Sequence, residues 1–422
     1  MGYDFAKHIG VFDLYDDGQR LWFTSIEYNA LFCMDKTAGA MHYMGSFPGE
    51  PWFCWRLYAQ VVAYEQKLYF VPCTATEIGV YDMETHQFSK INFGLQKDEN
   101  DISDIHYMKK FTSGFVYGGK LFLMPCCYPH MVIYDIATGK IETDDRLYDY
   151  YHKRYGKAAT SPDHTFYLCW IARRMDEESV VFELHCNANK VIRYNFRTRS
   201  FTDLDIGTKD NTYGYIQFDG QRIILYDMPR DQLVCYDISS KQTRTVDLAT
   251  VKGFEPQGDK TSFTDMGLLR GKIWLIPAAA NLGLRADPAT GRVAVLPDLS
   301  NVSQQPGSGL PYLNLARTYH DCLYINDNRL KAILAFDADG GQRCFVFRLS
   351  PEDVQVLEQN AISWRMEQGE RVFAEGDCKL NSFLSSCMEG SPEAGGTKKS
   401  SAGETIYTDL SQKTSLLKGN PS

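Results

Sequence analysis

The sequence lacks any long, uninterrupted apolar segment. No run among its 422 residues approaches the roughly 18 apolar residues that a membrane-spanning helix requires, so we expect no membrane insertion. The N-terminus, Met1 to His8, has neither the basic segment nor the apolar segment of a signal peptide. We therefore expect a cytoplasmic protein whose 12 cysteines remain thiols in a reducing compartment.

The short motifs of common catalytic and metal sites are also missing. There is no Walker-type glycine loop, no G-x-S-x-G elbow and no H-E-x-x-H pair. There is no C-x-x-C pair, and the adjacent Cys126 and Cys127 do not have a metal-ligand spacing. We expect no bound metal and no cofactor, and these patterns name no catalytic nucleophile.

A surplus of basic charge is absent as well. The chain has 44 basic and 53 acidic residues, which gives a formal net charge of −9. Proteins whose main partner is nucleic acid or an anionic membrane surface typically carry clustered basic charge. We therefore expect neither partner here.

What the sequence does contain is an internal repeat. Its clearest copy has an apolar strand-like run, Lys67 to Pro72, followed by Ile78 to Thr85, and the markers Leu68 and Asp82 lie 14 positions apart (82 − 68). A seventh copy, Phe166 to Asn195, measures 29 positions, which predicts an insertion of 15 residues. The other copies with a spacing of 14 are Leu21 to Asp35, Leu121 to Asp135, Ile223 to Asp237, Ile273 to Asp287 and Leu323 to Asp337. Self-similarity with a period of about 40–50 residues is the signature of a radial or stacked repeat fold.

Each copy reads as a four-stranded antiparallel meander. Triplets such as Leu68-Tyr69-Phe70 have no polar face, as expected for a strand covered on both sides. Dipeptides such as Asp219-Gly220 precede the triplets and suit tight hairpins, and the marker Asp can hold a turn through backbone N–H groups. The sequence thus predicts an all-β fold: a seven-bladed β-propeller of four-stranded antiparallel blades over residues 1–350.

Residues 351–422 form a C-terminal extension that we expect to be partly helical and partly flexible. Ser350-Pro351-Glu352-Asp353 resembles a helix start, with Ser as N-cap and Pro in the first turn. Residues 377–388 offer a second short helix, and 389–403 have the composition of a flexible linker. Within copy four, 179–185 and 190–192 are predicted to form a hairpin that projects from the ring.

The repeat resembles the kelch type of β-propeller. The matching residues are the apolar second strand and the turn Tyr81-Asp82-Met83-Glu84-Thr85, with Tyr134-Asp135-Ile136-Ala137-Thr138 as a second example. Kelch repeats usually carry a double glycine after the second strand, where this chain has Pro72-Cys73. The resemblance implies binding of proteins or glycans in most cases, and an enzyme of the galactose-oxidase kind in a few.

Long connections between copies, at about 46–55, 92–110, 142–160, 246–264 and 297–315, are expected to gather at one end of the central channel. Two of them are rich in aromatic residues, whose flat faces suit sugars. The same aromatics could instead plug the channel or fill gaps between blades. The predicted ligand-binding residues on this face are Trp52, Trp55, His106, Tyr148, Tyr151 and Arg154.

Two functions remain open from the sequence. The first is a non-catalytic propeller that binds a partner protein or a glycan-related ligand through the long-loop face. The second is a carbohydrate- or nucleotide-sugar-active enzyme, a lyase or hydrolase, with its site at the mouth of the channel. The enzyme would place at least two of Asp101, Asp104, His106, His152 and Arg154 in a polar axial pocket. An acid-rich loop that stays hydrated is the alternative for the first three.

Overall fold

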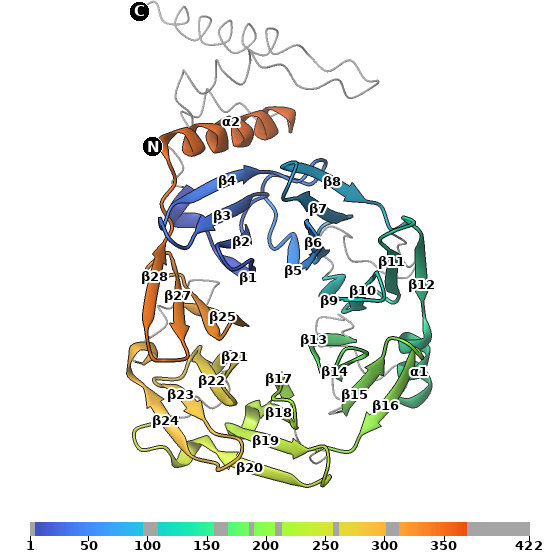
Figure 1. The fold of residues 1–422 in the computed structure, drawn as a ribbon, viewed down its shortest axis with the longest axis vertical. Coiled ribbons are helices and arrows are strands. Elements are labelled where there is room, and N and C mark those ends of the chain that lie inside the picture. Colours follow the sequence, from blue (N-terminus) through green and yellow to red (C-terminus); the bar gives the residue numbers. More distant parts are fainter. Residues whose placement is uncertain are drawn as a thin grey trace, which may run out of the picture. The chain divides into compact units, whose positions relative to one another are not determined.

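The structure, a computed structural model, describes residues 5–95, 109–155, 168–184, 190–206, 213–255, 261–300 and 312–368. One compact unit, Ile9–Ala40 with Met44–Phe347, contains seven four-stranded antiparallel sheets arranged as the blades of a ring, except for Met41–Tyr43 of the outermost strand of the first sheet (Figure 1). The first strand of each blade is innermost and the fourth is outermost. The predicted seven-bladed propeller is therefore confirmed.

Each blade consists of four strands that follow one another in the chain. Blades one to three are β1 (Val11–Asp16), β2 (Arg20–Ser25), β3 (Leu31–Asp35), β4 (Met41–Gly45); β5 (Tyr58–Tyr64), β6 (Lys67–Pro72), β7 (Ile78–Asp82), β8 (Gln87–Ile91); and β9 (Phe111–Tyr117), β10 (Lys120–Pro125), β11 (Met131–Asp135), β12 (Ile141–Asp144). Blades four and five are β13 (Cys169–Arg174), β14 (Ser179–Leu184), β15 (Lys190–Asn195), β16 (Ser200–Leu204); and β17 (Tyr213–Phe218), β18 (Arg222–Asp227), β19 (Gln232–Asp237), β20 (Thr243–Asp247). Blades six and seven are β21 (Phe263–Leu269), β22 (Lys272–Pro277), β23 (Gly283–Ala286), β24 (Val293–Leu296); and β25 (Leu313–Tyr319), β26 (Cys322–Asp327), β27 (Ala332–Asp337), β28 (Gln342–Val346).

The described helices are few. The α-helices are α1 (Arg146–Tyr155) and α2 (Pro351–Glu367), and the short 3₁₀ turns are η1 (Phe5–His8), η2 (Met228–Arg230), η3 (Leu248–Thr250) and η4 (Pro297–Leu299). Ser350 caps α2, because its hydroxyl accepts a hydrogen bond from Asp353 N at 3.0 Å, as the sequence predicted. The helix predicted at 377–388 and the linker at 389–403 lie outside the described residues. In the part of the chain that the structure describes, no helix is both long and apolar enough to cross a membrane.

The core consists of apolar clusters between neighbouring blades. The second strand of a blade is buried on both faces; in β6 only Lys67 is exposed. One cluster joins Trp22 of blade one to Tyr58, Phe70 and Tyr81 of blade two, and comparable clusters occupy the next five junctions along the chain. The outermost strands, such as β8, are largely exposed. No blade buries both faces by itself, which is why the repeat is stable only as a ring.

The marker Asp performs the turn role expected from the sequence. Asp82 Oδ1 accepts hydrogen bonds from the backbone N–H groups of Glu84 (3.0 Å) and Thr85 (2.9 Å). Asp135 and Asn195 hold the corresponding turns by accepting from the N–H three residues later, each at 2.9 Å. Donation from Thr85 N–H, followed by that from Glu84, lowers the pKa of Asp82.

The prediction of an insertion of 15 residues in copy four was wrong. Ser179 pairs with Asn195 in the same way as Lys67 pairs with Asp82, so the true marker is Val180, and its spacing to Asn195 is 15 positions (195 − 180). The segment Ser179–Leu184 is therefore the ordinary second strand of blade four, β14, and not part of a projecting hairpin. The apolar residues around Phe166 precede the blade and imitate a second strand, whereas β14 contains the polar Ser179 and Glu183.

The ring closes through side chains and not through a shared strand. Every blade is built from one continuous segment, so blade seven meets blade one only by packing and hydrogen bonding. Asn314 Nδ2 donates to Val11 O at 2.6 Å, and Tyr324 OH donates to Asp16 Oδ2 at 2.6 Å. These contacts join residues more than 300 positions apart in the chain.

Candidate functional site

All seven innermost strands share an irregularity near their N-terminal ends. In each of them the register with the second strand shifts; in β1, for example, the shift lies between Val11 and Leu14. Such β-bulges bend a strand and re-aim its side chains. Here the bulges bring side chains from every blade to the same end of the channel.

The bulges also allow one blade to hydrogen-bond to the next. Asp13, Gln60, Ser113 and Asp265 each lie two residues after the first paired residue of their strand. Each accepts a hydrogen bond from a backbone N–H of the following blade: Val61 N to Asp13 Oδ2 at 2.8 Å, Gly114 N to Gln60 Oε1 at 2.7 Å, Ala172 N to Ser113 Oγ at 3.2 Å and Ala316 N to Asp265 Oδ2 at 3.0 Å. In blade four this position is Ile171, which has no acceptor on its side chain.

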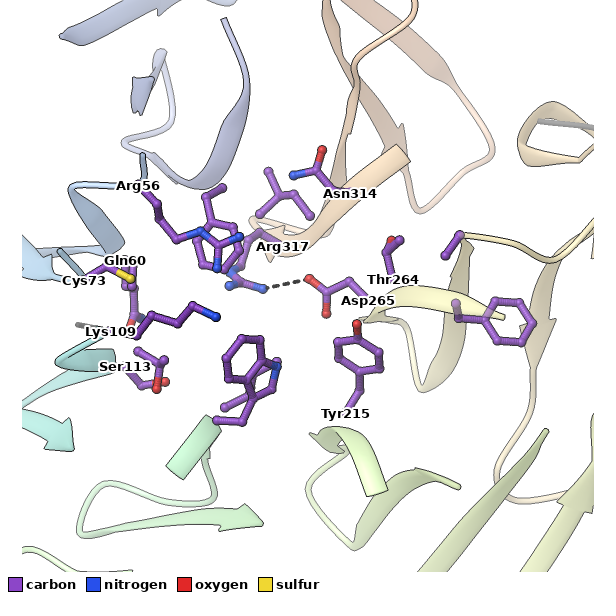
Figure 2. Close-up of a pocket in the computed structure, with 18 of the residues that line it drawn as sticks. Arg56, Gln60, Cys73, Lys109, Ser113, Tyr215, Thr264, Asp265, Asn314 and Arg317 are labelled. Carbon is purple, nitrogen blue, oxygen red and sulfur yellow. Dashed lines mark hydrogen bonds and ion pairs between the residues drawn. The ribbon is translucent and has the colours of Figure 1, made fainter. Parts of the chain in front are cut away.

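A pocket of about 520 Å³ lies on the axis at this end of the ring, where the long connections lead into the innermost strands. Every blade contributes to it, and Figure 2 shows several of the side chains converging. The charged side chains that line it are Arg56, Lys109, Arg173, Asp265 and Arg317. Among the described lining residues, four cations thus face one carboxylate.

Arg317 lies between two carboxylates. Its Nε donates to Asp13 Oδ1, and its Nη1 lies 3.3 Å from Asp265 Oδ2. Burial lowers the pKa of Arg317, but the charges of Asp13 and Asp265 outweigh burial and raise it overall. For Asp13 the balance is reversed: burial raises its pKa above 3.8, although Arg317 opposes the shift.

Arg173 is less well compensated than Arg317. Its Nη2 is 3.8 Å from Asp265 Oδ1, and its Nη1 donates to Ala172 O at 3.3 Å. Burial, together with the positive charge of Arg317, lowers the pKa of Arg173 to about 10. A second cation therefore shares the same carboxylate at a longer distance.

Arg56 lies apart from these carboxylates. Its backbone has φ 56°, a left-handed conformation held by donation of its N–H to Ile26 O (2.7 Å) and by Thr74, whose N–H and hydroxyl both donate to Arg56 O. Its guanidinium lies 3.8 Å from the ring centre of Phe12, and its buried Nε has no hydrogen-bond partner among the described residues. An aromatic face orients a cation without neutralising it.

Two more lining groups complete the site. Lys109 Nζ lies 5.3 Å from the ring centre of Trp170. Tyr215 stacks on Tyr226, with ring centres 6.4 Å apart, and Figure 2 shows Tyr215 on the side of Asp265, across the pocket from Arg56 and Lys109. Burial raises the pKa of Tyr215 well above 10, so its hydroxyl keeps its proton at neutral pH.

None of the described residues that the sequence analysis named as ligand-binding lines this pocket. Trp52 is 4% exposed and stacks on Tyr28, whereas Trp55 is 43% exposed. Tyr151, on α1, is fully buried between blades three and four, and Tyr148 packs against the same cluster. Trp52 and Tyr151 thus fill gaps in the structure, which was the alternative considered for the aromatics. Their role in binding stays a prediction.

The structure does not describe the side chains of the other predicted site residues. Asp101, Asp104 and His106 are outside the described residues, and the side chains of His152 and Arg154 are not described either. Six residues that line the pocket were not predicted from the sequence: Arg56, Lys109, Arg173, Asp265, Arg317 and Tyr215. The sequence does hold one indication of these pocket residues. When the innermost strands of the copies are aligned with one another, polar residues such as Asp13, Gln60 and Asp265 recur at the same position.

No family model matches the chain, and no curated protein sequence matches it. Among solved structures, it resembles a catalytically inactive variant of virginiamycin B lyase from Staphylococcus aureus with quinupristin, at a TM-score of 0.54 and 10% identity, covering 78% of this chain and 94% of that one. It also resembles a streptogramin B lyase, at a TM-score of 0.52 and 11% identity, covering 76% and 92%. At this identity the likeness shows a β-propeller fold and nothing finer, so the kelch type stays a prediction.

Proposed function

We propose that this chain is a binding protein whose axial pocket takes a small anionic ligand. The observation that carries the proposal is the charge of the pocket: among the described lining residues, Arg56, Lys109, Arg173 and Arg317 face a single lining carboxylate, Asp265. The volume of about 520 Å³ falls within the range of roughly 300–1,000 Å³ that is typical of small-molecule sites.

The surroundings strengthen the effect of these charges. A cleft lined by charges of one sign, with walls of low dielectric, concentrates the field and attracts ions of the opposite sign. Arg56 contributes most clearly, because its guanidinium lies on Phe12 and not against a carboxylate. An anion that enters the pocket can accept charge-assisted hydrogen bonds from the guanidinium of Arg56, for which the described residues show no carboxylate partner.

A glycan-related molecule with an acidic group is the ligand class that we favour. The pocket combines cationic groups with the aromatic side chains Phe12, Trp170 and Tyr215, and sugars pack their C–H faces on such rings. The kelch resemblance also favours a binding function. Capture of a partner protein through this face is the other outcome that the experiment below distinguishes.

The alternative of a carbohydrate- or nucleotide-sugar-active enzyme has less support from the described residues. A lyase or hydrolase needs a group that can accept or donate a proton in the pocket. Asp265, the one lining carboxylate that is described, already accepts from Met266 N (2.7 Å) and Ala316 N (3.0 Å) and contacts two arginines. The lyases among the similar structures share only the fold, so they do not favour catalysis.

Isothermal titration with glucuronate and with glucose tests the proposal. The two sugars differ mainly by a carboxylate, so we expect glucuronate to bind and glucose not to bind measurably. Arg56→Met removes the cation and keeps much of the volume; we expect it to weaken binding about 10-fold or more. Arg197→Met is the matched control, because Arg197 is exposed on blade four and paired with Glu178.

Equal binding of both sugars, or no effect of Arg56→Met, contradicts the proposal. If neither sugar binds but a cell extract yields a protein that the wild type retains and Arg56→Met does not, the pocket recognises a partner protein and the small-molecule proposal is wrong.

A further inference from the structure

The hydrogen bonds between blades use up acceptors that would otherwise face the pocket. Gln60 Oε1 accepts from Gly114 N, which leaves the two N–H groups of its amide for a ligand. Ser113 Oγ accepts from Ala172 N, which leaves its O–H as a donor. In both cases the fold occupies one acceptor position and leaves the donors.

Both carboxylate oxygens of Asp265 already accept hydrogen bonds from the protein. Oδ1 accepts from Met266 N at 2.7 Å and lies 3.8 Å from Arg173 Nη2, while Oδ2 accepts from Ala316 N at 3.0 Å and lies 3.3 Å from Arg317 Nη1. A ligand that offers an ammonium group or many hydroxyl donors therefore meets no open carboxylate among the described lining residues. The pocket favours ligands rich in acceptors.

The donors form two groups from different blades. Arg56, Gln60 and Lys109 come from the start of blades two and three, and Figure 2 shows them on one side of the pocket. Arg173, Tyr215 and Arg317 come from blades four, five and seven. In Figure 2 Tyr215 lies on the side of the pocket opposite Arg56 and Lys109, and Arg317 extends between these two sides.

We infer that the ligand carries two separate oxyanion groups, carboxylate or phosphate, joined by a short carbon skeleton. One oxyanion contacts the Arg56 group and the other contacts Arg173 and Tyr215. This inference rests on the proposed function and narrows it from anions in general to ligands with two oxyanion groups, such as sugar diacids or sugar bisphosphates. These ligands are called dianions here, and ligands with one oxyanion group are called monoanions, although each phosphate group itself carries up to two charges. Among the described residues, the hydroxyl of Tyr215 has no recorded hydrogen bond and is suited to donate to the second oxyanion.

The state of Arg173 agrees with a second anion. It is a largely buried cation next to another cation, Arg317, and its nearest carboxylate oxygen is 3.8 Å away. A ligand oxyanion at this position supplies the compensation that the protein leaves incomplete.

A matched series of six-carbon sugars tests the inference: glucarate has two carboxylates, glucuronate has one and glucose has none. Glucose 1,6-bisphosphate and glucose 6-phosphate form the phosphate arm, which distinguishes the two kinds of oxyanion. By isothermal titration of the full chain at constant ionic strength, we expect the dianion of at least one arm to bind about 10- to 100-fold more tightly than its monoanion.

Substitutions test which side chains bind each of the two oxyanions of the ligand. Tyr215→Phe and Arg173→Lys are expected to bring the affinity for the dianion towards that for the monoanion, and to leave the monoanion held by Arg56 nearly unchanged. Tyr215→Phe removes one hydroxyl and no charge, so it remains informative if Arg173→Lys fails to fold. Arg197→Met, distant from the pocket, is expected to change neither affinity.

The outcomes separate the two proposals. If monoanions bind as tightly as dianions in both arms and Arg56→Met abolishes binding, the proposed function stands and the inference of two oxyanions is wrong. The same holds if Tyr215→Phe and Arg173→Lys leave the preference for the dianion unchanged. If no anion of either arm binds, both the inference and the proposed function are wrong.

Discussion

Glu183 provides the sharpest test of how this fold balances charge. It lies on β14, is 2% exposed, and neither of its carboxylate oxygens has a hydrogen-bond partner in the described parts of the chain. Burial raises the pKa of Glu183 well above 4.5, and Arg173 only partly opposes the shift. Burial therefore favours the protonated form of this side chain in the folded protein.

The expected magnitude follows from linkage between protonation and folding. Because Glu183 binds its proton more tightly when folded, its contribution to stability is complete below about pH 4.5 and is lost as pH rises towards the folded pKa. Each unit of pH in this range lowers the free energy of unfolding by about 1.4 kcal/mol. At pH 7, which is 2.5 units above 4.5 (7 − 4.5), the loss is therefore at most about 3.5 kcal/mol.

Glu183→Gln removes the titration and keeps the shape and polarity of the side chain. We expect this variant to be more stable than the wild type at pH 7, by at most about 3.5 kcal/mol, and by a smaller margin at pH 5. Glu183→Met, which also removes the buried polar group, is expected to be at least as stable as Glu183→Gln. Urea unfolding followed by tryptophan fluorescence at both pH values measures the differences.

Glu177→Gln, at an exposed position before the same strand, is the matched control and is expected to change stability little at either pH. The reasoning is refuted if Glu183→Gln is less stable than the wild type at pH 7, or if both unfold with the same dependence on pH. Either result means that Glu183 is ionised and compensated in the folded protein.

Three further substitutions test the fold. Asp82→Ala removes the acceptor of the turn and is expected to lower the midpoint of thermal unfolding, whereas Asp82→Asn keeps the acceptor and is expected to lower it less. Arg317→Met leaves buried carboxylates without their partner and is expected to cost about 3–5 kcal/mol, against less than about 1 kcal/mol for the exposed Arg197→Met. If Arg317→Met and Arg197→Met lower the urea midpoint by similar amounts, Arg317 does not hold a buried ion-pair cluster. Gly114→Ala places a Cβ 2.6 Å from Val71 Cγ2 and is expected to cost about 1–3 kcal/mol in urea unfolding; an unchanged midpoint means that the blades can separate freely at this junction.

Much of the architecture was predictable because it repeats in a short segment. The distance from Leu68 to Asp82 equals the length of two paired strands and their loop, and the same distance recurs in five other copies. The turn held by Asp82 depends on residues only two or three positions away. Blade four escaped correct prediction because Ser179 and Glu183 interrupt the apolar pattern of its second strand.

The pocket could not be predicted in this way. Arg173 and Arg317 are 144 positions apart (317 − 173), and they meet only because a bulge and the curvature of the ring direct both to the axis. The aromatic residues of the long connections were predicted from the sequence to bind a ligand, but Tyr151 is buried between blades three and four. Aromatic side chains serve packing and binding equally well, and composition does not separate the two uses.

By itself, the sequence determined the number of blades, the strands of six of them and the chemistry of their turns, since each depends on interactions within about 15 residues. Only the tertiary structure decided which polar side chains are consumed in holding blades together and which remain for a ligand. That division depends on how Asp13, Gln60 and Asp265 face the backbone of the following blade, and this geometry exists only once the ring has closed.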